Sequence, residues 1–217
     1  MTASFDQYLD AAQRQILAGL DSPERIQAFL DETPYSTEDA DRCPVSVLRD
    51  RLAHCLDGGL FAAAALRCLG YPPLIVDLIP EPGTDDDHIL AIYKVDGLLG
   101  AVAKSNFTGL RFREAVYRTV RELVMSYFES YFNVRGEKTL RAYTVPLNLQ
   151  DLDSTGWMWR DEGVEPVVHR LDRLRQFRVI SPAMAVRLSP VDKLSYAAGT
   201  VGTNPAGLYK PLQSRQL

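Results

Sequence analysis

Cysteine is scarce in this chain of 217 residues, which contains only Cys43, Cys55 and Cys68. An odd and small number of cysteines does not suit a disulfide framework. The first residues also lack the basic and then apolar pattern of a secretory signal segment, so we expect a cytoplasmic protein. In that compartment the useful question is whether one of the three thiols is reactive.

Two further features are missing, a basic excess and a long apolar run. Lys and Arg number 24 against 28 Asp and Glu, which gives a net charge of −4, whereas nucleic-acid binders usually carry a basic surplus. The longest apolar run, near residues 60–66, is far below the ~18 residues that a membrane-spanning helix needs. The sequence therefore predicts neither a nucleic-acid partner nor a membrane partner.

Signals for a cofactor or a metal are absent as well. Gly58-Gly59 is not followed by the Lys-Ser/Thr pair of a phosphate-binding loop. Asp85, Asp86 and Asp87 could join His54, Cys55 and His88 as ligands, but their spacing matches no metal motif. We expect no cofactor and no metal.

The composition is that of a folded globular protein, because 46% of the residues are hydrophobic and 24% are charged. Apolar residues at helical spacing predict one helix over residues 5–20 and a second from Pro23 to just before Pro34. Ser46 is placed to cap a short helix that runs through Leu52. Residues 55–69 then read as a buried helix that begins at Cys55 and ends before Gly70.

The middle of the chain reads as strands. We predict strands over 74–79, 89–95 and 98–103, with a hairpin turn at Asp96-Gly97. Further along, we predict a long helix over 112–132, an extended segment over 140–149, a helix over 164–177 and an irregular tail from Ser189. This order predicts an α+β fold with a mostly antiparallel sheet, made of a domain over residues 1–149 and a C-terminal extension over 150–217 that packs on it.

Cys55 is the best candidate for a nucleophile. A thiol attacks as the thiolate, and a helix N-terminus or a partner imidazolium lowers its pKa. The helix that begins at Cys55 would direct unpaired N–H groups at the sulfur, and the same groups can bind an oxyanion. Cys68 lies about 220° around the same helix at 100° per residue, so we predict that it faces elsewhere and packs in the core.

Three histidines are candidate partners for Cys55. His54 is adjacent in sequence, so its side chain should leave the helix start in another direction. His169 lies in a charged helical pattern and reads as a surface residue. His88 begins a strand directly after the aspartate loop, which is the arrangement that nucleophilic cysteine chemistry requires.

A third residue should orient the imidazole of His88. If Asp96 and Gly97 form a two-residue turn, Val95 pairs with Leu98 and position 88 lies opposite position 105. A three-residue turn would shift the partner to Lys104 or Asn106. Lys104 cannot accept a hydrogen bond, whereas Ser105 and Asn106 can. We predict Asn106, with Ser105 as the alternative.

The motifs around these residues carry a family resemblance. Residues 43–75 resemble the core of transglutaminase-like proteins, which are related to papain, because a short helix leads to Cys55, a helix rich in small residues follows, and Gly-Tyr-Pro opens the first strand. His88 begins a later strand, as the family's histidine does. Residues 20–149 resemble, more narrowly, a bacterial subgroup described only as transglutaminase-like.

The resemblance implies a cysteine-dependent acyl-transfer enzyme, either a peptidase or amidase or a transglutaminase-type enzyme, that acts on a peptide or amide group, which can belong to another protein. The chain departs from the family pattern in two places, with His54 where Gly is common and Asn106 where Asp is usual. Residues 46–54 also contain no Gln or Tyr for the oxyanion site. These departures leave open an alternative, a catalytically inactive binding or scaffold protein with the same fold.

Overall fold

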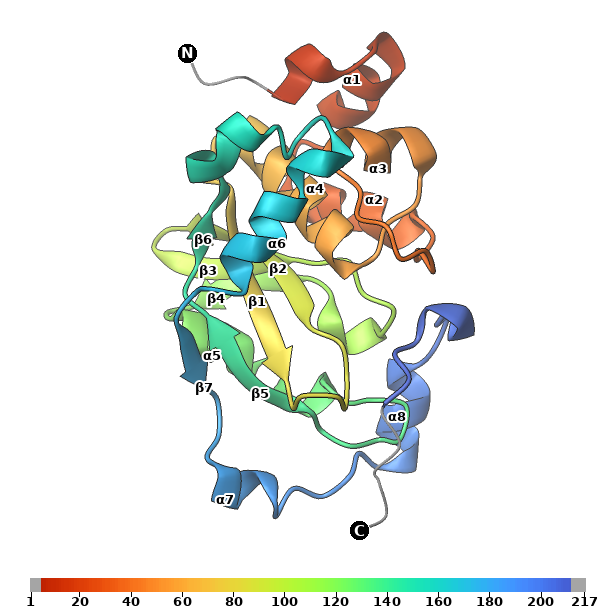
Figure 1. Cartoon of the computed structure of the whole chain (residues 1–217), viewed down its shortest axis with the longest axis vertical. Coiled ribbons are helices and arrows are strands. Elements are labelled where there is room, and N and C mark those ends of the chain that lie inside the picture. The colour runs from red at the N-terminus through yellow and green to blue at the C-terminus, as the bar shows by residue number, and fades with distance from the viewer. Residues whose placement is uncertain (1–4, 212–217) are drawn as a thin grey trace.

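The helices in the first third of the chain pack together at one side of a β-sheet (Figure 1). The computed structural model describes residues 5–211, and the fold is α+β with a mostly antiparallel sheet. None of the helices in this described part has the length and apolarity to cross a membrane. The α-helices are α1 (Ala11–Ala18), α2 (Pro23–Glu32), α3 (Pro44–Asp50), α4 (Cys55–Cys68), α5 (Val120–Met125), α6 (Glu165–Leu171), α7 (Pro182–Ala185) and α8 (Lys193–Gly199).

The sheet contains seven strands in the order β4-β3-β2-β1-β5-β7, and β6 also pairs with β1. Every strand pair in it is antiparallel. The strands are β1 (Leu74–Pro80), β2 (His88–Val95), β3 (Leu98–Val102), β4 (Arg113–Tyr117), β5 (Leu140–Thr144), β6 (Leu147–Asn148) and β7 (Gln176–Arg178).

The β2–β3 hairpin has the predicted turn. Asp96 and Gly97 both have positive φ angles, 49° and 86°, as a two-residue type I′ turn requires. Val95 pairs with Leu98 and Ala91 with Val102, so the predicted register is confirmed. The paired strand ends at Val102, however, and the chain leaves the ladder before it reaches position 105.

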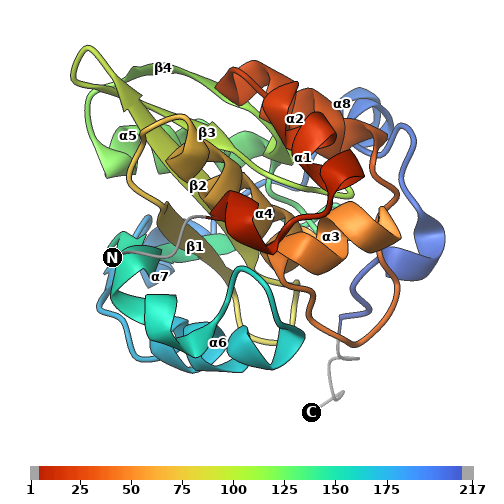
Figure 2. The same ribbon diagram turned by 90° about the horizontal axis from the view of Figure 1, so that it is seen from above.

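Helix α4 lies across the sheet and carries the candidate nucleophile at its first residue. Figure 2 shows α4 over β1 and β2, with α2 and α3 beside it. The helix is buried on almost every side, which explains its apolar sequence. A Cβ atom at Gly58 would come within 2.1 Å of the Lys104 Cβ, and one at Gly59 within 2.5 Å of the Ile89 Cγ2. These two glycines therefore let α4 approach the sheet closely.

The start of α4 is fixed by a capping box built on a histidine. The His54 imidazole Nδ1 accepts a hydrogen bond from the Leu56 N–H at 3.2 Å. The Asp57 carboxylate accepts one from the His54 N–H at 3.0 Å and another from the Arg42 N–H at 2.7 Å. The bond from Leu56 satisfies a helix N–H that would otherwise be unpaired, and the two bonds to Asp57 tie the cap residue and Arg42 to the first turn, so together they define where α4 begins.

Residues 150–211 are built into the same fold. Strand β7 extends the sheet by pairing with β5. Trp157, Met158 and Val167 are buried in the core that α4 and the N-terminal helices share. The tail that we expected to be irregular from Ser189 contains α8 and a short 3-10 turn, Pro205–Gly207, so this prediction is wrong in part.

The predicted long helix over 112–132 is wrong. Residues Arg113–Tyr117 form the edge strand β4, and Thr119 then caps the short helix α5. Pairing with β3 overrides the helical spacing of these residues, while Leu123, Val124 and Tyr127 still pack together against the face of the sheet opposite α4.

Three other helix boundaries also differ from the prediction. The helix expected over 5–20 is interrupted, because Asp10 caps a new helix after a 3-10 turn. The short helix before Cys55 begins at Pro44 rather than after Ser46. The helix expected over 164–177 ends at Leu171, because the following residues join the sheet.

Candidate active site

Cys55 and His88 lie in one small cavity, between the first residue of α4 and the first residue of β2. The cavity has a volume of about 40 Å³, and Tyr35, Ser105, Asn106, Leu110 and Tyr131 are among the residues that line it. Cys55 is 7% exposed and His88 is 4% exposed. The Cys55 Sγ lies 3.6 Å from the Asp87 carbonyl oxygen, and no hydrogen bond joins it to the His88 imidazole within residues 5–211.

His88 is held by a backbone carbonyl. Its Nε2 lies 2.7 Å from the Leu110 carbonyl oxygen. A carbonyl can only accept, so Nε2 carries the proton and Nδ1 remains free as an acceptor. Burial lowers the pKa of His88 to about 4, against the effect of the Leu110 hydrogen bond, and the charge of Arg113 lowers it further. At neutral pH the imidazole is therefore neutral, which is the form that can act as a base.

The two predicted orienting residues line the cavity but bond elsewhere. The Asn106 side chain donates to the Asn204 carbonyl at 2.9 Å and accepts from the Asn204 N–H at 2.8 Å. The Ser105 hydroxyl accepts from the Phe107 N–H at 3.0 Å. The contact that orients His88 is instead the one to Leu110, because the chain turns back through a 3-10 turn (Thr108–Leu110) after leaving β3.

Tyr35 is a site residue that the sequence did not indicate. Its neighbours pair with the segment before α4, with Ser36 N–H donating to Ala53 carbonyl at 3.0 Å, and this brings the ring to the start of the helix. Burial raises the pKa of the Tyr35 hydroxyl well above its ordinary value. Hydrogen bonding with the Cys55 thiol raises this pKa further, whereas hydrogen bonding with the Cys55 backbone N–H lowers it. The hydroxyl thus stays protonated beside the sulfur, as a donor.

The Cys55 thiol is in an environment that disfavours the thiolate. Burial raises its pKa well above the ordinary value, and the charges of Asp87, Asp86 and Asp77 raise it further. Burial also raises the pKa of Asp77 to about 8 and that of Asp87 to about 6. The sequence predicts a thiol activated by the helix N-terminus, but here burial and the nearby carboxylates outweigh that effect.

The His54 ring contacts Asp41, Asp57 and the Leu56 N–H, and no hydrogen bond joins it to the Cys55 sulfur within residues 5–211. Its Nε2 lies 3.3 Å from an Asp41 oxygen and 3.4 Å from an Asp57 oxygen. Donor atoms of these three residues lie within 4.8 Å of one another, which is close enough for a metal ion. The Asp57 oxygens, however, already accept two backbone hydrogen bonds, so the group is accounted for as the cap of α4.

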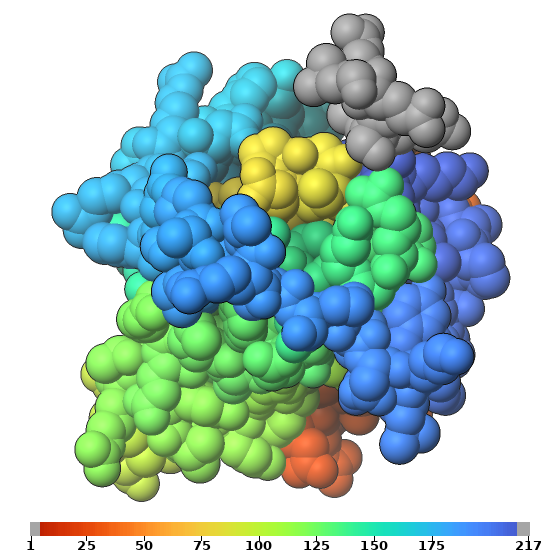
Figure 3. All heavy atoms as spheres, turned by 90° about the horizontal axis from the view of Figure 1, so that it is seen from below, coloured from red at the N-terminus to blue at the C-terminus, as the bar shows by residue number. Residues whose placement is uncertain are grey.

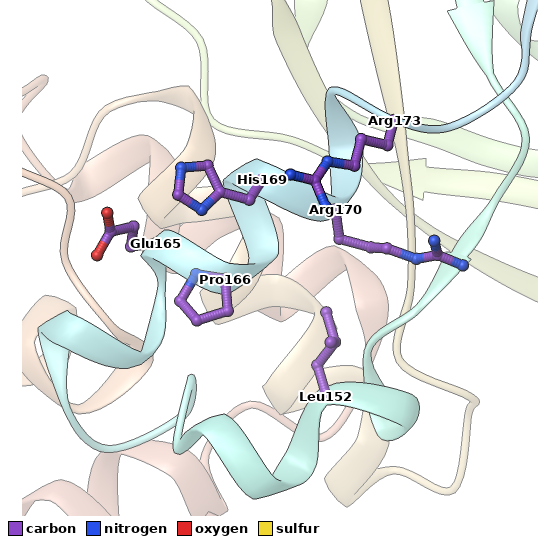
Figure 4. A pocket seen from close by; sticks show the side chains of 6 residues that line it. All are labelled: Leu152, Glu165, Pro166, His169, Arg170 and Arg173. Carbon is purple, nitrogen blue, oxygen red and sulfur yellow. The ribbon is translucent and has the colours of Figure 1, made fainter.

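Two of the wider pockets outside this cavity are lined by histidines. One, of about 390 Å³, adjoins Cys55 on the side of His54 and the aspartate loop and is lined by five carboxylates, those of Glu38, Asp39, Asp41, Asp86 and Asp87. The other, of about 390 Å³, is formed by α6 and the 3-10 turn Leu149–Thr155 (Figure 4). His169, Arg170 and Arg173 line it, and His169 is exposed, as predicted.

Comparison with known proteins does not assign this site to a family. The chain matches no protein-family model, and a search of curated proteins found no similar sequence.

Proposed function

We propose that the protein is a cysteine-dependent acyl-transfer enzyme with a transglutaminase-like core, in which Cys55 is the nucleophile and His88 the base. The observation that carries this proposal is the shared cavity, which brings a thiol at a helix N-terminus together with a neutral imidazole whose Nδ1 is free to accept a proton. We assign the orienting role to the Leu110 carbonyl and not to the side chain of Asn106.

The chemistry follows from these positions. Cys55 Sγ attacks the carbonyl carbon of a peptide or amide group as its proton passes to His88 Nδ1. The oxyanion that forms accepts hydrogen bonds from the Cys55 N–H and the Tyr35 hydroxyl. The C–N bond then breaks, and the leaving amine takes the proton from His88. Water or a second amine then attacks the thioester carbonyl and gives its proton to His88. The C–S bond breaks, and His88 returns this proton to the departing Cys55 sulfur.

The test is acylation of Cys55 by a small activated ester such as p-nitrophenyl acetate, read by intact-protein and peptide mass spectrometry. A Cys68→Ser background removes a cysteine that is exposed in the structure, so the prediction that it packs in the core is wrong. We expect acetyl on Cys55 and none in Cys55→Ala. Loss of the base in His88→Ala should slow acylation roughly 100-fold, and Tyr35→Phe should slow it roughly 10- to 100-fold. Equal rates in the reference protein and His88→Ala would contradict the proposal.

One observation favours a second function, a binding or scaffold protein without catalysis. The carboxylates around Cys55 and its burial keep the thiol protonated, and a protonated thiol is a poor nucleophile. This alternative expects no acetylated Cys55 in any variant, even under conditions in which alkylation shows that the thiol is accessible.

A further inference from the structure

A C-terminal segment, residues 200–209, crosses the Cys55–His88 cavity, and we name it the strap. It follows α8, which is fixed to the body of the protein on the side where the strap begins. Gly199 packs on the Phe132 ring, where a Cβ atom would come within 2.6 Å, and the Tyr196 hydroxyl donates to the Val134 carbonyl at 3.0 Å. Figure 3 shows this blue C-terminal chain lying against the green residues that follow α5.

The polar contacts of the strap fall on residues that line the cavity. The Thr203 hydroxyl donates to the Asn106 carbonyl at 3.0 Å, and the Asn204 side-chain amide donates to the Tyr35 carbonyl at 3.3 Å. Gly207 and Tyr209 themselves line the cavity that contains Cys55 and His88. The strap therefore bridges Asn106 and Tyr35, which both line the cavity of the thiol.

Asn106 forms hydrogen bonds with the backbone of the strap and not with its side chains. Its amide donates to the carbonyl of Asn204 and accepts from the N–H of the same residue. A side-chain amide used in this way can pair with the backbone of almost any residue other than proline. The contact therefore suits recognition of a peptide main chain whatever its sequence, as in binding modes where backbone hydrogen bonds give the affinity.

Gly207 is the point of closest fit. A Cβ atom at this position would come within 2.8 Å of the Tyr35 ring and within 3.4 Å of the Asn106 side-chain nitrogen. A residue with a side chain would fit between these two groups only if the Tyr35 ring shifted. The next residues, Leu208 and Tyr209, line the wider pocket on the other side of Cys55.

We propose that the strap is an internal peptide ligand of the Cys55 cleft, and that the cleft binds peptide segments with a glycine at the Gly207 position in place of it. The inference deepens the proposed function, because it names peptide as the substrate class. With the strap in place the chain is latent, and displacement of the strap opens access to the thiol. The burial that keeps Cys55 a neutral thiol fits this closed state.

The experiment measures the rate at which Cys55 is alkylated by iodoacetamide in the full chain, in the Cys68→Ser background, with mass spectrometry to locate the label. Gly207→Val forces the strap off Tyr35, and we expect alkylation at least tenfold faster. Ala206→Val is the matched control, because Ala206 is exposed and its added methyl groups meet solvent. We expect the control to stay within twofold of the reference rate.

A second variant removes the hydrogen bonds instead of adding bulk. Asn204 has φ −80° and ψ 109°, which proline tolerates before Pro205. Asn204→Pro thus keeps the backbone path but loses the N–H that Asn106 accepts from and the amide that contacts Tyr35. It should also be alkylated at least tenfold faster. Thermal unfolding of each variant checks that the domain remains folded.

Peptide binding completes the test. A synthetic peptide of residues 203–211 should slow alkylation of Cys55 in Gly207→Val back toward the reference rate, and the same peptide with valine at the glycine position should not. Unchanged alkylation in both strap variants, or equal protection by the two peptides, would overturn the inference. These measurements need no acyl transfer, so an accessible Cys55 that never acylates would refute the proposed function and leave the strap inference standing.

Discussion

The two histidines nearest Cys55 lie in opposite electrostatic environments. His54 faces Asp41 and Asp57, and although burial alone would lower its pKa, the hydrogen bond to Asp41 and the charges of both aspartates raise it above the ordinary value. His88 faces a backbone carbonyl in a buried position, and burial lowers its pKa to about 4.

This difference assigns different roles to the two histidines, although position in the sequence alone would suggest that His54 is the partner of Cys55. His54 is next to Cys55 in the chain, yet its imidazole is used as a helix cap, with Nδ1 accepting a hydrogen bond from the Leu56 N–H. His88 is 33 positions away by number, yet it shares the thiol's cavity. Asp41 and Asp57 raise the pKa of His54, whereas burial lowers the pKa of His88, and this difference decides which histidine is neutral and available as a base.

The largest effect on stability should come from replacing Asp57, whose carboxylate contacts His54 and accepts two backbone hydrogen bonds. Asp57→Ala leaves the N–H groups of Arg42 and His54 without their acceptors, and at 1 to 3 kcal/mol for each buried donor we expect a loss of about 4 kcal/mol in the free energy of unfolding. Urea unfolding at pH 7 measures it. Asp41→Ala is the control, since that carboxylate is exposed and its loss should cost below about 1 kcal/mol.

The contribution of His88 to the stability of the fold should depend on pH. The folded-state pKa of about 4 lies below the unfolded value of about 6.5, so the unfolded chain binds the proton more readily between them. Stability is therefore lost as pH falls through this window, by about 2 to 3 kcal/mol between pH 7 and pH 4.5. His88→Gln should be less sensitive to acid by that amount when urea unfolding is compared at the two pH values. Equal acid sensitivity would show that His88 is not buried as a neutral ring.

A smaller effect of opposite sign should come from His54. Its pKa is raised in the folded state, so its contribution is fully present below the unfolded value of about 6.5 and is lost as pH rises through the folded value. Because the side chain is partly solvated, we expect below about 1 kcal/mol. Between pH 6 and pH 9 the stability of His54→Gln should fall by that much less than the stability of the reference protein, and an equal fall in the two proteins would break the contrast with His88.

Local signals explain what could be predicted from the sequence. Helix α4, the Asp96-Gly97 turn and the hairpin register were predictable because the residues that define them are neighbours in the chain. The placement of Cys55 and His88 at the starts of adjacent elements follows from the same signals. The β4 segment was not predictable, because its aromatic and apolar residues have helical spacing and only pairing with β3 makes it a strand.

The missed site residues share a different cause, which is distance along the chain. Tyr35 reaches Cys55 through a bridge between segments whose own residues carry no signal of pairing. Asn204 pairs with Asn106 across 98 positions, and Leu110 contributes only a carbonyl, which every residue has. Register arithmetic pointed to positions 104–106, but the strand ends at Val102 and the orienting contact comes from beyond it.

The two glycines at the start of α4 have a mechanical consequence for the site. Gly58 and Gly59 set the distance between the helix and the sheet, because Lys104 and Ile89 fill the space that side chains on these glycines would need. Cys55 is carried by the helix and His88 by the sheet, so the gap between sulfur and imidazole is set by that distance. A single methyl group at either glycine would push the helix away from the sheet. The distance between the Cys55 sulfur and the His88 imidazole would then increase, although neither of these residues is changed.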